Sequence, residues 1–142
     1  EGLPLVHNGM EACNAHRLAF FEKDPIDWSQ REGCDYGALL KDLIAFRTAN
    51  PALGNGQWGA VMQQVVNDRP QQLFGWVRQK DGNKVVGLFN LSDTAVEARL
   101  ADGLAAGTYR EFRDGDAVTI AAGDTVSLPA WGFRLLSTGG ER

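Results

Sequence analysis

Eight short segments with alternating apolar and polar residues follow one another from about residue 57 onward, and this pattern constrains the fold most strongly. The segments are AVMQQVV, LFGWVRQ, KVVGLFNL, AVEARL, TYREF, AVTI, TVSL and WGFRLLS. A period of two places alternate side chains on opposite faces of a strand. Turn residues separate the segments, and Asp81-Gly82 in particular favours a tight hairpin. The spacing therefore predicts an antiparallel sandwich or barrel.

Residues 1–56 follow a different pattern, which predicts one short strand, an irregular loop and one helix. The apolar run LPLV predicts the strand. Asp35 is a good helix N-cap, and the apolar residues after it recur at helical spacing. The helix ends at Asn50-Pro51, because the residue before a proline avoids the helical region. The sequence therefore predicts two domains, residues 1–56 and residues 57–142.

Charge and composition exclude several classes of partner. The net charge is -4 and no cluster of Lys and Arg is present, so we expect no nucleic-acid partner. No apolar run approaches the ~20 residues of a membrane span, so we expect no membrane partner. Cys13 and Cys34 are the only cysteines. Two cysteines make neither a disulfide framework nor a full zinc site, and the sequence predicts ordinary thiols.

The loop region offers candidate catalytic and metal-binding side chains. The carboxylates available for a glycosidase pair are Glu11, Glu22, Asp24 and Asp27. Loop carboxylates more often accept backbone hydrogen bonds and cap turns, and we favour that interpretation. His7 and His16 would join Glu11 around a metal, but their spacing does not match the helical H-E-x-x-H arrangement. We therefore predict no metal site.

Four tryptophans are candidates for stacking on sugar rings: Trp28, Trp58, Trp76 and Trp131. Trp76 and Trp131 lie inside strand patterns, so we predict that both belong to the core. Trp58 follows a Gly-rich turn and is the better candidate for an exposed ring, although core packing is slightly favoured there too.

The motifs also resemble a known family. GLPLVHNGME is similar to the G-x-P-x-x-Y-x-G-x-E signature of the α-amylase family of glycoside hydrolases, which marks the last strand of the catalytic (β/α)8 barrel. RLAFFEKDPIDW resembles the loop that follows, and LLKDLIAFRTANPAL resembles the final barrel helix. KVVGLFNLSD and LPAWGFRLL are typical of strands in the family's C-terminal β-sandwich, domain C. The resemblance implies a mainly β fold, an antiparallel Greek-key β-sandwich preceded by a β/α remnant of a barrel.

The resemblance also carries expectations about the site. The family's three catalytic carboxylates lie on earlier barrel strands, so none maps onto this chain, which should be inactive alone. The intact parent would retain configuration while hydrolysing α-1,4-glucosidic bonds. His7, Asn8 and Glu11 lie in the strand-eight motif and are expected to bind substrate, although His7 stands where the family usually has Tyr. No cofactor is expected in this chain, whereas an intact family member can hold calcium.

The expected function is that of the C-terminal, non-catalytic portion of an α-amylase-like glycoside hydrolase acting on α-glucans. The sandwich would cover and stabilise the catalytic barrel, which is the expected partner together with an α-glucan. The alternative is a free-standing carbohydrate-binding or interaction module. An apolar strand edge without its barrel neighbours would also favour self-association through residues 1–30. A starch-degrading parent favours an extracellular or periplasmic location.

Overall fold

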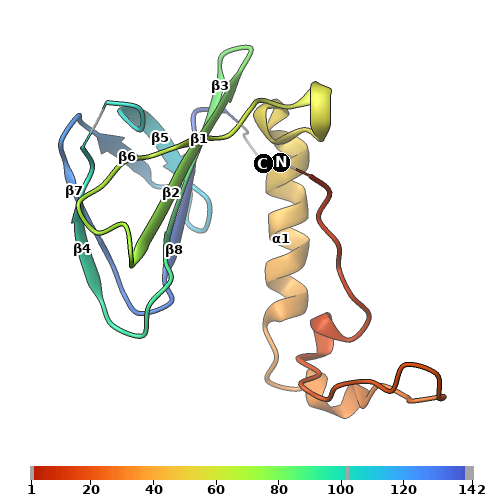
Figure 1. Cartoon of the computed structure of the whole chain (residues 1–142). Helices are drawn as coiled ribbons and strands as arrows, with labels where there is room; N and C mark the ends of the chain where they lie inside the picture. The colour runs from red at the N-terminus through yellow and green to blue at the C-terminus, as the bar shows by residue number, and fades with distance from the viewer. Residues whose placement is uncertain (1, 102, 140–142) are drawn as a thin grey trace. The chain divides into compact units, whose positions relative to one another are not determined.

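A computed structural model describes residues 2–101 and 103–139, and these form two compact units (Figure 1). One unit is Gly2–Phe46 and the other begins at Arg47. The second unit starts before the predicted boundary at residues 56 and 57. The reason is that two short 3-10 turns, η3 (Pro51–Leu53) and η4 (Gly56–Trp58), belong with the strands rather than with the loop region.

The second unit is an antiparallel β-sandwich, as predicted. Its strands are β1 (Gln63–Gln64), β2 (Leu73–Lys80), β3 (Asn83–Asn90), β4 (Val96–Arg99), β5 (Gly107–Glu111), β6 (Ala117–Ile120), β7 (Thr125–Leu128) and β8 (Phe133–Ser137). The larger sheet has the order β1-β2-β3-β8-β5-β6, and β4 pairs with β7 in the smaller sheet. Because β8 lies between β3 and β5, the order is not sequential, as a Greek-key sandwich requires. Each predicted segment overlaps one of these strands.

The hydrophobic core lies between the two sheets. The larger sheet contributes buried residues from several strands, and the smaller sheet contributes Val96, Ala98, Val126 and Leu128. Tyr109 on β5 belongs to this core, and its hydroxyl donates to the Ala105 carbonyl at 2.8 Å. Burial raises the pKa of Tyr109 to about 12, so the phenol stays neutral and keeps donating.

A buried polar cluster fastens the segment around η3 to the larger sheet. Asn83 Nδ2 donates to Asn50 Oδ1 at 2.8 Å, and the Ala52 N–H donates to Asn83 Oδ1 at 3.1 Å. The Ser137 hydroxyl also donates to Asn50 Oδ1. Asn50, Asn83 and Ser137 are all buried. Their mutual hydrogen bonds offset the cost of removing these polar groups from water.

Arg78 on β2 adds a second set of contacts to the same segment. Its Nε donates to the Ala60 carbonyl at 2.7 Å and its Nη2 donates to the Gly54 carbonyl at 2.8 Å. The backbone at Gly59 comes so close to Gly54 that a Cβ at residue 59 would overlap the Gly54 carbonyl group and press on Arg78 Nη2. Glycine is therefore required at this position.

The first unit contains a helix but no strand among its described residues. Helix α1 (Tyr36–Ala49) begins after Asp35 and ends before Pro51, as predicted, and none of its residues is buried. The strand expected in LPLV is wrong, and Leu3 and Leu5 are strongly exposed. A strand needs a neighbour for its backbone hydrogen bonds, and the described chain pairs none with this run. Self-association through residues 1–30 stays a prediction.

A disulfide joins Cys13 to Cys34, so the expectation of ordinary thiols is wrong. Cys13 directly follows η1 (Met10–Ala12), and Cys34 lies between η2 (Trp28–Arg31) and α1. Cys13 has a left-handed backbone, which turns the chain after η1, and its N–H donates to the Met10 carbonyl at 3.1 Å. Sequence spacing alone does not show this approach, because an irregular loop brings the two cysteines together.

We predict that Asn83→Ala lowers the free energy of unfolding by about 1–3 kcal/mol, because it leaves buried partners without hydrogen bonds. Urea unfolding followed by tryptophan fluorescence measures the change. Gln79→Ala removes an exposed amide from the neighbouring strand and is the matched control, with an expected change within about 0.5 kcal/mol. Equal unfolding midpoints for the two variants would contradict this account of the cluster.

We predict that reduction of the disulfide loosens residues 10–34 and leaves the sandwich unchanged. The cross-link spans a sequence separation of 21, for which loop closure is worth about 3 kcal/mol. Hydrogen exchange followed by mass spectrometry should therefore speed up in peptides from this loop and not in β2 or β3. The Cys13→Ser/Cys34→Ser double variant should behave like the reduced protein. An unchanged rate of hydrogen exchange in the loop after reduction would show that the disulfide does not order residues 10–34.

Candidate functional site

The structure places His7 and Asn8 together at the turn that leads into η1. Both are exposed, and His7 Nδ1 lies 3.0 Å from the Asn8 carbonyl oxygen. The Met10 N–H donates to the His7 carbonyl at 3.1 Å, which closes the turn. Glu11 is half-buried, and its Oε2 accepts the Gly9 N–H at 3.1 Å. Substrate binding by His7, Asn8 and Glu11 stays a prediction.

A shallow pocket of about 310 Å³ opens beside His7 and Asn8. Its lining is His7, Asn8, Met10, Asn14, His16, Arg17 and Leu18. Sequence reasoning missed Asn14 and Arg17 here and weighed His16 only as a metal ligand. Their closeness in the sequence is the one signal that would have indicated them. Imidazole, amide and guanidinium groups together supply donors and acceptors suited to sugar hydroxyls.

Three of the four loop carboxylates, Glu11, Asp24 and Asp27, accept backbone N–H groups, as the sequence analysis favoured. Asp24 accepts the Ala19 N–H at 2.9 Å and lies 3.0 Å from His16 Nε2. The hydrogen bond from Ala19, followed by that from His16, lowers the pKa of Asp24 below its usual range. Asp27 accepts the hydroxyl and the N–H of Ser29, which lower the pKa of Asp27. Within residues 2–101 and 103–139, no group of three or more His, Cys, Asp or Glu side chains is arranged to hold a metal.

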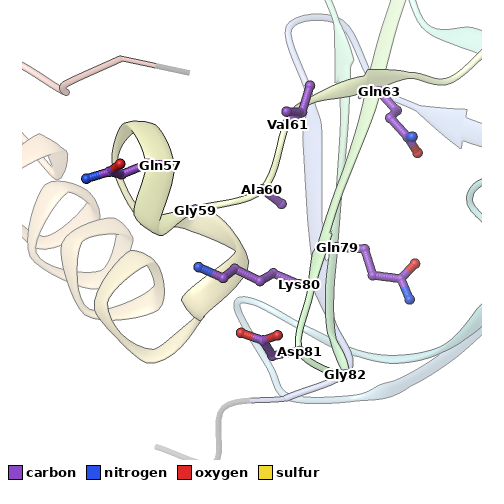
Figure 2. A pocket seen from close by; sticks show the side chains of 9 residues that line it. All are labelled: Gln57, Gly59, Ala60, Val61, Gln63, Gln79, Lys80, Asp81 and Gly82. Atoms are coloured by element: carbon purple, nitrogen blue, oxygen red, sulfur yellow. The ribbon is translucent and has the colours of Figure 1, made fainter.

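A larger pocket of about 600 Å³ lies in the sandwich unit at the β2–β3 hairpin (Figure 2). It is lined by Gln57, Gly59, Ala60, Val61, Gln63, Gln79, Lys80, Asp81 and Gly82. Figure 2 shows Lys80 extending toward η4, where its Nζ donates to the Trp58 carbonyl at 2.6 Å, whereas Gln63 and Gln79 point the other way. These polar groups diverge, so they do not converge on a single ligand.

The outer face of the larger sheet, opposite the core, carries a row of aromatic rings. We call Phe74, Trp76, Phe89 and Phe133 the sheet-face cluster. Phe74, Phe89 and Phe133 are aligned across β2, β3 and β8, and the Phe89 and Phe133 centroids lie 6.0 Å apart. The Trp76 ring lies over Gly87, where a Cβ would come within 2.4 Å of the indole. Each ring of the cluster is half-buried.

The tryptophan predictions need correction. Trp76 is half-buried on the outer face rather than in the core between the sheets. Trp131 is 67% exposed and Trp58 is 70% exposed, so core packing is wrong for both. A period of two shows that successive side chains alternate, but it does not show which face meets another layer.

No helix in the described residues is both long enough and apolar enough to cross a bilayer.

Comparison with known proteins gives a family and a fold. Residues 62–135 match the family model described as Maltogenic Amylase, C-terminal domain. The structure of a noncanonic maltogenic α-amylase, AmyB from Thermotoga neapolitana, has a TM-score of 0.74 at 16% identity, covering 99% of this chain and 34% of that one. The structure of the cyclomaltodextrin glucanotransferase CldA has a TM-score of 0.59 at 17% sequence identity, and the match covers 82% of this chain and 24% of CldA. The structure of AmyP in complex with maltose has a TM-score of 0.55 at 17% sequence identity, and the match covers 79% of this chain and 21% of AmyP.

These likenesses at low identity show the fold alone. The chain spans 34% or less of the length of these three structures. No curated protein matches the chain.

We predict that acid releases the Asp24 turn at a pH below the ordinary pKa of aspartate. The pKa of Asp24 is lower in the folded protein than in the unfolded chain. The contribution of Asp24 to folding stability is therefore fully present above the unfolded pKa, and it is lost as the pH falls through the folded pKa. The amide shift of Ala19, followed by NMR against pH, reports this step. Asp24→Asn should remove the titration from the Ala19 signal. A wild-type midpoint at or above about 3.9 would contradict the assignment.

Proposed function

Because this chain belongs to the maltogenic amylase C-terminal domain family, we propose that its β-sandwich covers and stabilises the catalytic barrel of an α-glucan-hydrolysing enzyme. The sandwich is an amylase-like non-catalytic domain, and the chain is the C-terminal portion of such an enzyme in this proposal. The barrel is its partner, and the intact enzyme acts on α-glucans with retention of configuration.

The sheet-face cluster is the observation that carries the proposal. Half-buried aromatic rings on the outer face of a sheet leave apolar surface in water, and burying it is worth about 25 cal/mol per Å². The guanidinium of Arg113 lies 5.2 Å from the Phe133 ring centroid, which adds a cation–π contact at the margin of the cluster. An apolar patch with a charged margin has the composition of a protein–protein interface, whose core is apolar and whose rim is polar.

The cluster also favours a cover domain over a free-standing sugar-binding module. A binding module presents its rings to solvent as flat platforms, whereas these rings pack against one another. The Trp76 and Phe89 centroids lie 6.4 Å apart and those of Phe74 and Phe89 lie 6.5 Å apart. Rings packed in this way form one continuous apolar surface for a protein partner.

The disulfide supports an extracellular or periplasmic location for the proposed enzyme. Cys13 and Cys34 are joined in an irregular loop, and such bonds persist in oxidising compartments. An α-glucan-degrading enzyme outside the cytosol would meet its polymeric substrate there.

We predict that the chain alone releases no reducing sugar from starch, maltodextrin or a nitrophenyl maltoside. Retaining hydrolysis requires two carboxyl groups about 5 Å apart across the scissile bond. Glu11, Asp24 and Asp27 each accept backbone N–H groups instead. Turnover that survives purification and is lost in Glu11→Gln or Asp27→Asn would overturn the non-catalytic assignment.

We predict that the chain binds the separately produced catalytic barrel of the intact enzyme, and that Trp76→Ser and Phe133→Ser weaken binding by at least about tenfold each. Size-exclusion co-elution and calorimetry measure the complex. Trp58→Ala removes an exposed ring outside the cluster and should bind like the wild type. Circular dichroism checks that each variant is folded. Full binding by the two serine variants would show that the barrel uses another face.

A further inference from the structure

The turn before β8 presents a large aromatic ring to solvent from a strained backbone. Trp131 is 67% exposed and has φ +56°, in the left-handed region. A bulky residue in this region costs free energy that glycine would avoid, and an exposed indole gains little from burial. Trp131 therefore combines an unfavourable backbone conformation with an apolar ring in water. Backbone strain of this kind is common at functional sites.

The backbone of this turn is held in place by its neighbours. The Trp131 N–H donates to the Ser92 carbonyl at 3.0 Å, and the Gly132 N–H donates to the Pro129 carbonyl at 2.9 Å. The Asn90 N–H donates to the Gly132 carbonyl at 2.8 Å. The indole is thus attached to a turn that is fixed at both ends. A ligand that stacks on this ring therefore has to order the side chain of Trp131 but not its backbone.

The buried side chain of Asn90 locks this turn to the loop after β3. Its Nδ2 donates to the Pro129 carbonyl at 2.8 Å and to the Thr94 carbonyl at 2.7 Å. Its Oδ1 accepts the N–H and the hydroxyl of Ser92 at 3.0 and 2.7 Å. Asn90, Leu91 and Ser92 match the N-x-S glycosylation motif. Because Asn90 is 1% exposed, its amide holds the turn together and does not serve as a glycosylation acceptor. The two loops form one rigid surface.

Polar groups suited to sugar hydroxyls border this surface. Gln72 Nε2 donates to the Ser92 hydroxyl at 3.4 Å and to the Thr94 hydroxyl at 3.3 Å. Asp93 lies between these hydroxyls in the sequence and is exposed. A carboxylate and an amide accept and donate hydrogen bonds to vicinal hydroxyls, while the apolar face of a hexose meets an indole. The arrangement combines a stacking ring with hydrogen-bonding groups.

We propose that Trp131 and the adjoining loop 91–95 form a surface site that binds a glucose unit of an α-glucan chain. The indole stacks on the pyranose ring, and Asp93 and Gln72 bind its hydroxyls. The exposed ring and the hydrogen-bonded turn are observed, whereas the choice of an α-glucan rests on the proposed function. The site contains no catalytic residue and tethers the polymer outside the barrel.

Maltoheptaose binding to the full chain, measured by calorimetry and by affinity electrophoresis in a glycogen gel, tests the proposal. Trp131→Gly should weaken binding by at least about tenfold, because hot-spot rings carry most of the affinity at small sites. The same variant should unfold at an equal or higher temperature, because glycine relieves the left-handed backbone. A lost site in a fully stable protein separates binding from misfolding.

The controls separate this site from other surfaces and from the docking proposal. Trp58→Ala removes a ring of similar exposure and should bind maltoheptaose like the wild type, and Asp93→Ala should weaken binding. Trp131→Gly should still bind the catalytic barrel. Undiminished maltoheptaose binding in Trp131→Gly, equal binding of cellohexaose by the wild type, or no binding by the wild type would overturn the proposal. Barrel binding lost in Trp131→Gly would instead assign the ring to the docking interface and would also overturn it.

Discussion

The oxygen of the Asn50 side chain accepts hydrogen bonds from Asn83 and from Ser137, and the sandwich unit depends on this buried junction. The chain that leaves α1 forms only the short turns η3 and η4, so several of its backbone groups need partners from elsewhere in the chain. Asn83 satisfies the Ala52 N–H, and Arg78 satisfies the carbonyls of Gly54 and Ala60. Side chains of the larger sheet thereby supplement the backbone hydrogen bonds of η3 and η4. This explains why residues from Arg47 onward form one unit with the strands.

The junction also divides the outer face of the larger sheet into two regions. Near η3, which contacts β2 and β3, the buried residues include Ala52 and Val85. Farther along the same strands the sheet-face cluster is half-buried. One sheet therefore has a closed inner face, a covered outer region and an aromatic outer region. The last of these is the surface that we assign to the barrel, because it is the apolar part that the sandwich unit does not bury itself.

The first unit relies on different forces. Among its described residues, Ala12 is the buried apolar side chain, while Phe20 and Phe21 are 91% and 90% exposed. So little buried surface cannot order a loop of this length, since ordering each backbone residue costs about 1–2 kcal/mol. The Cys13–Cys34 bond reduces that cost by restricting the unfolded chain, and Asp24 and Asp27 fix local turns. Small disulfide-linked segments commonly compensate for a small core in this way.

The sequence by itself determined the local structure. The alternation in segments such as KVVGLFNL and the Asp81-Gly82 turn specify β2 and β3, because strand period and turn chemistry involve neighbouring residues only. Asp35 and Asn50-Pro51 likewise bound α1. The tertiary structure alone decided which residues meet across the chain. It placed Trp76 on an outer face, left Trp131 in solvent, joined Cys13 to Cys34 and left LPLV without a strand. Each of these outcomes depends on a partner distant in sequence or on its absence, and alternation of apolar and polar residues carries no information about that partner.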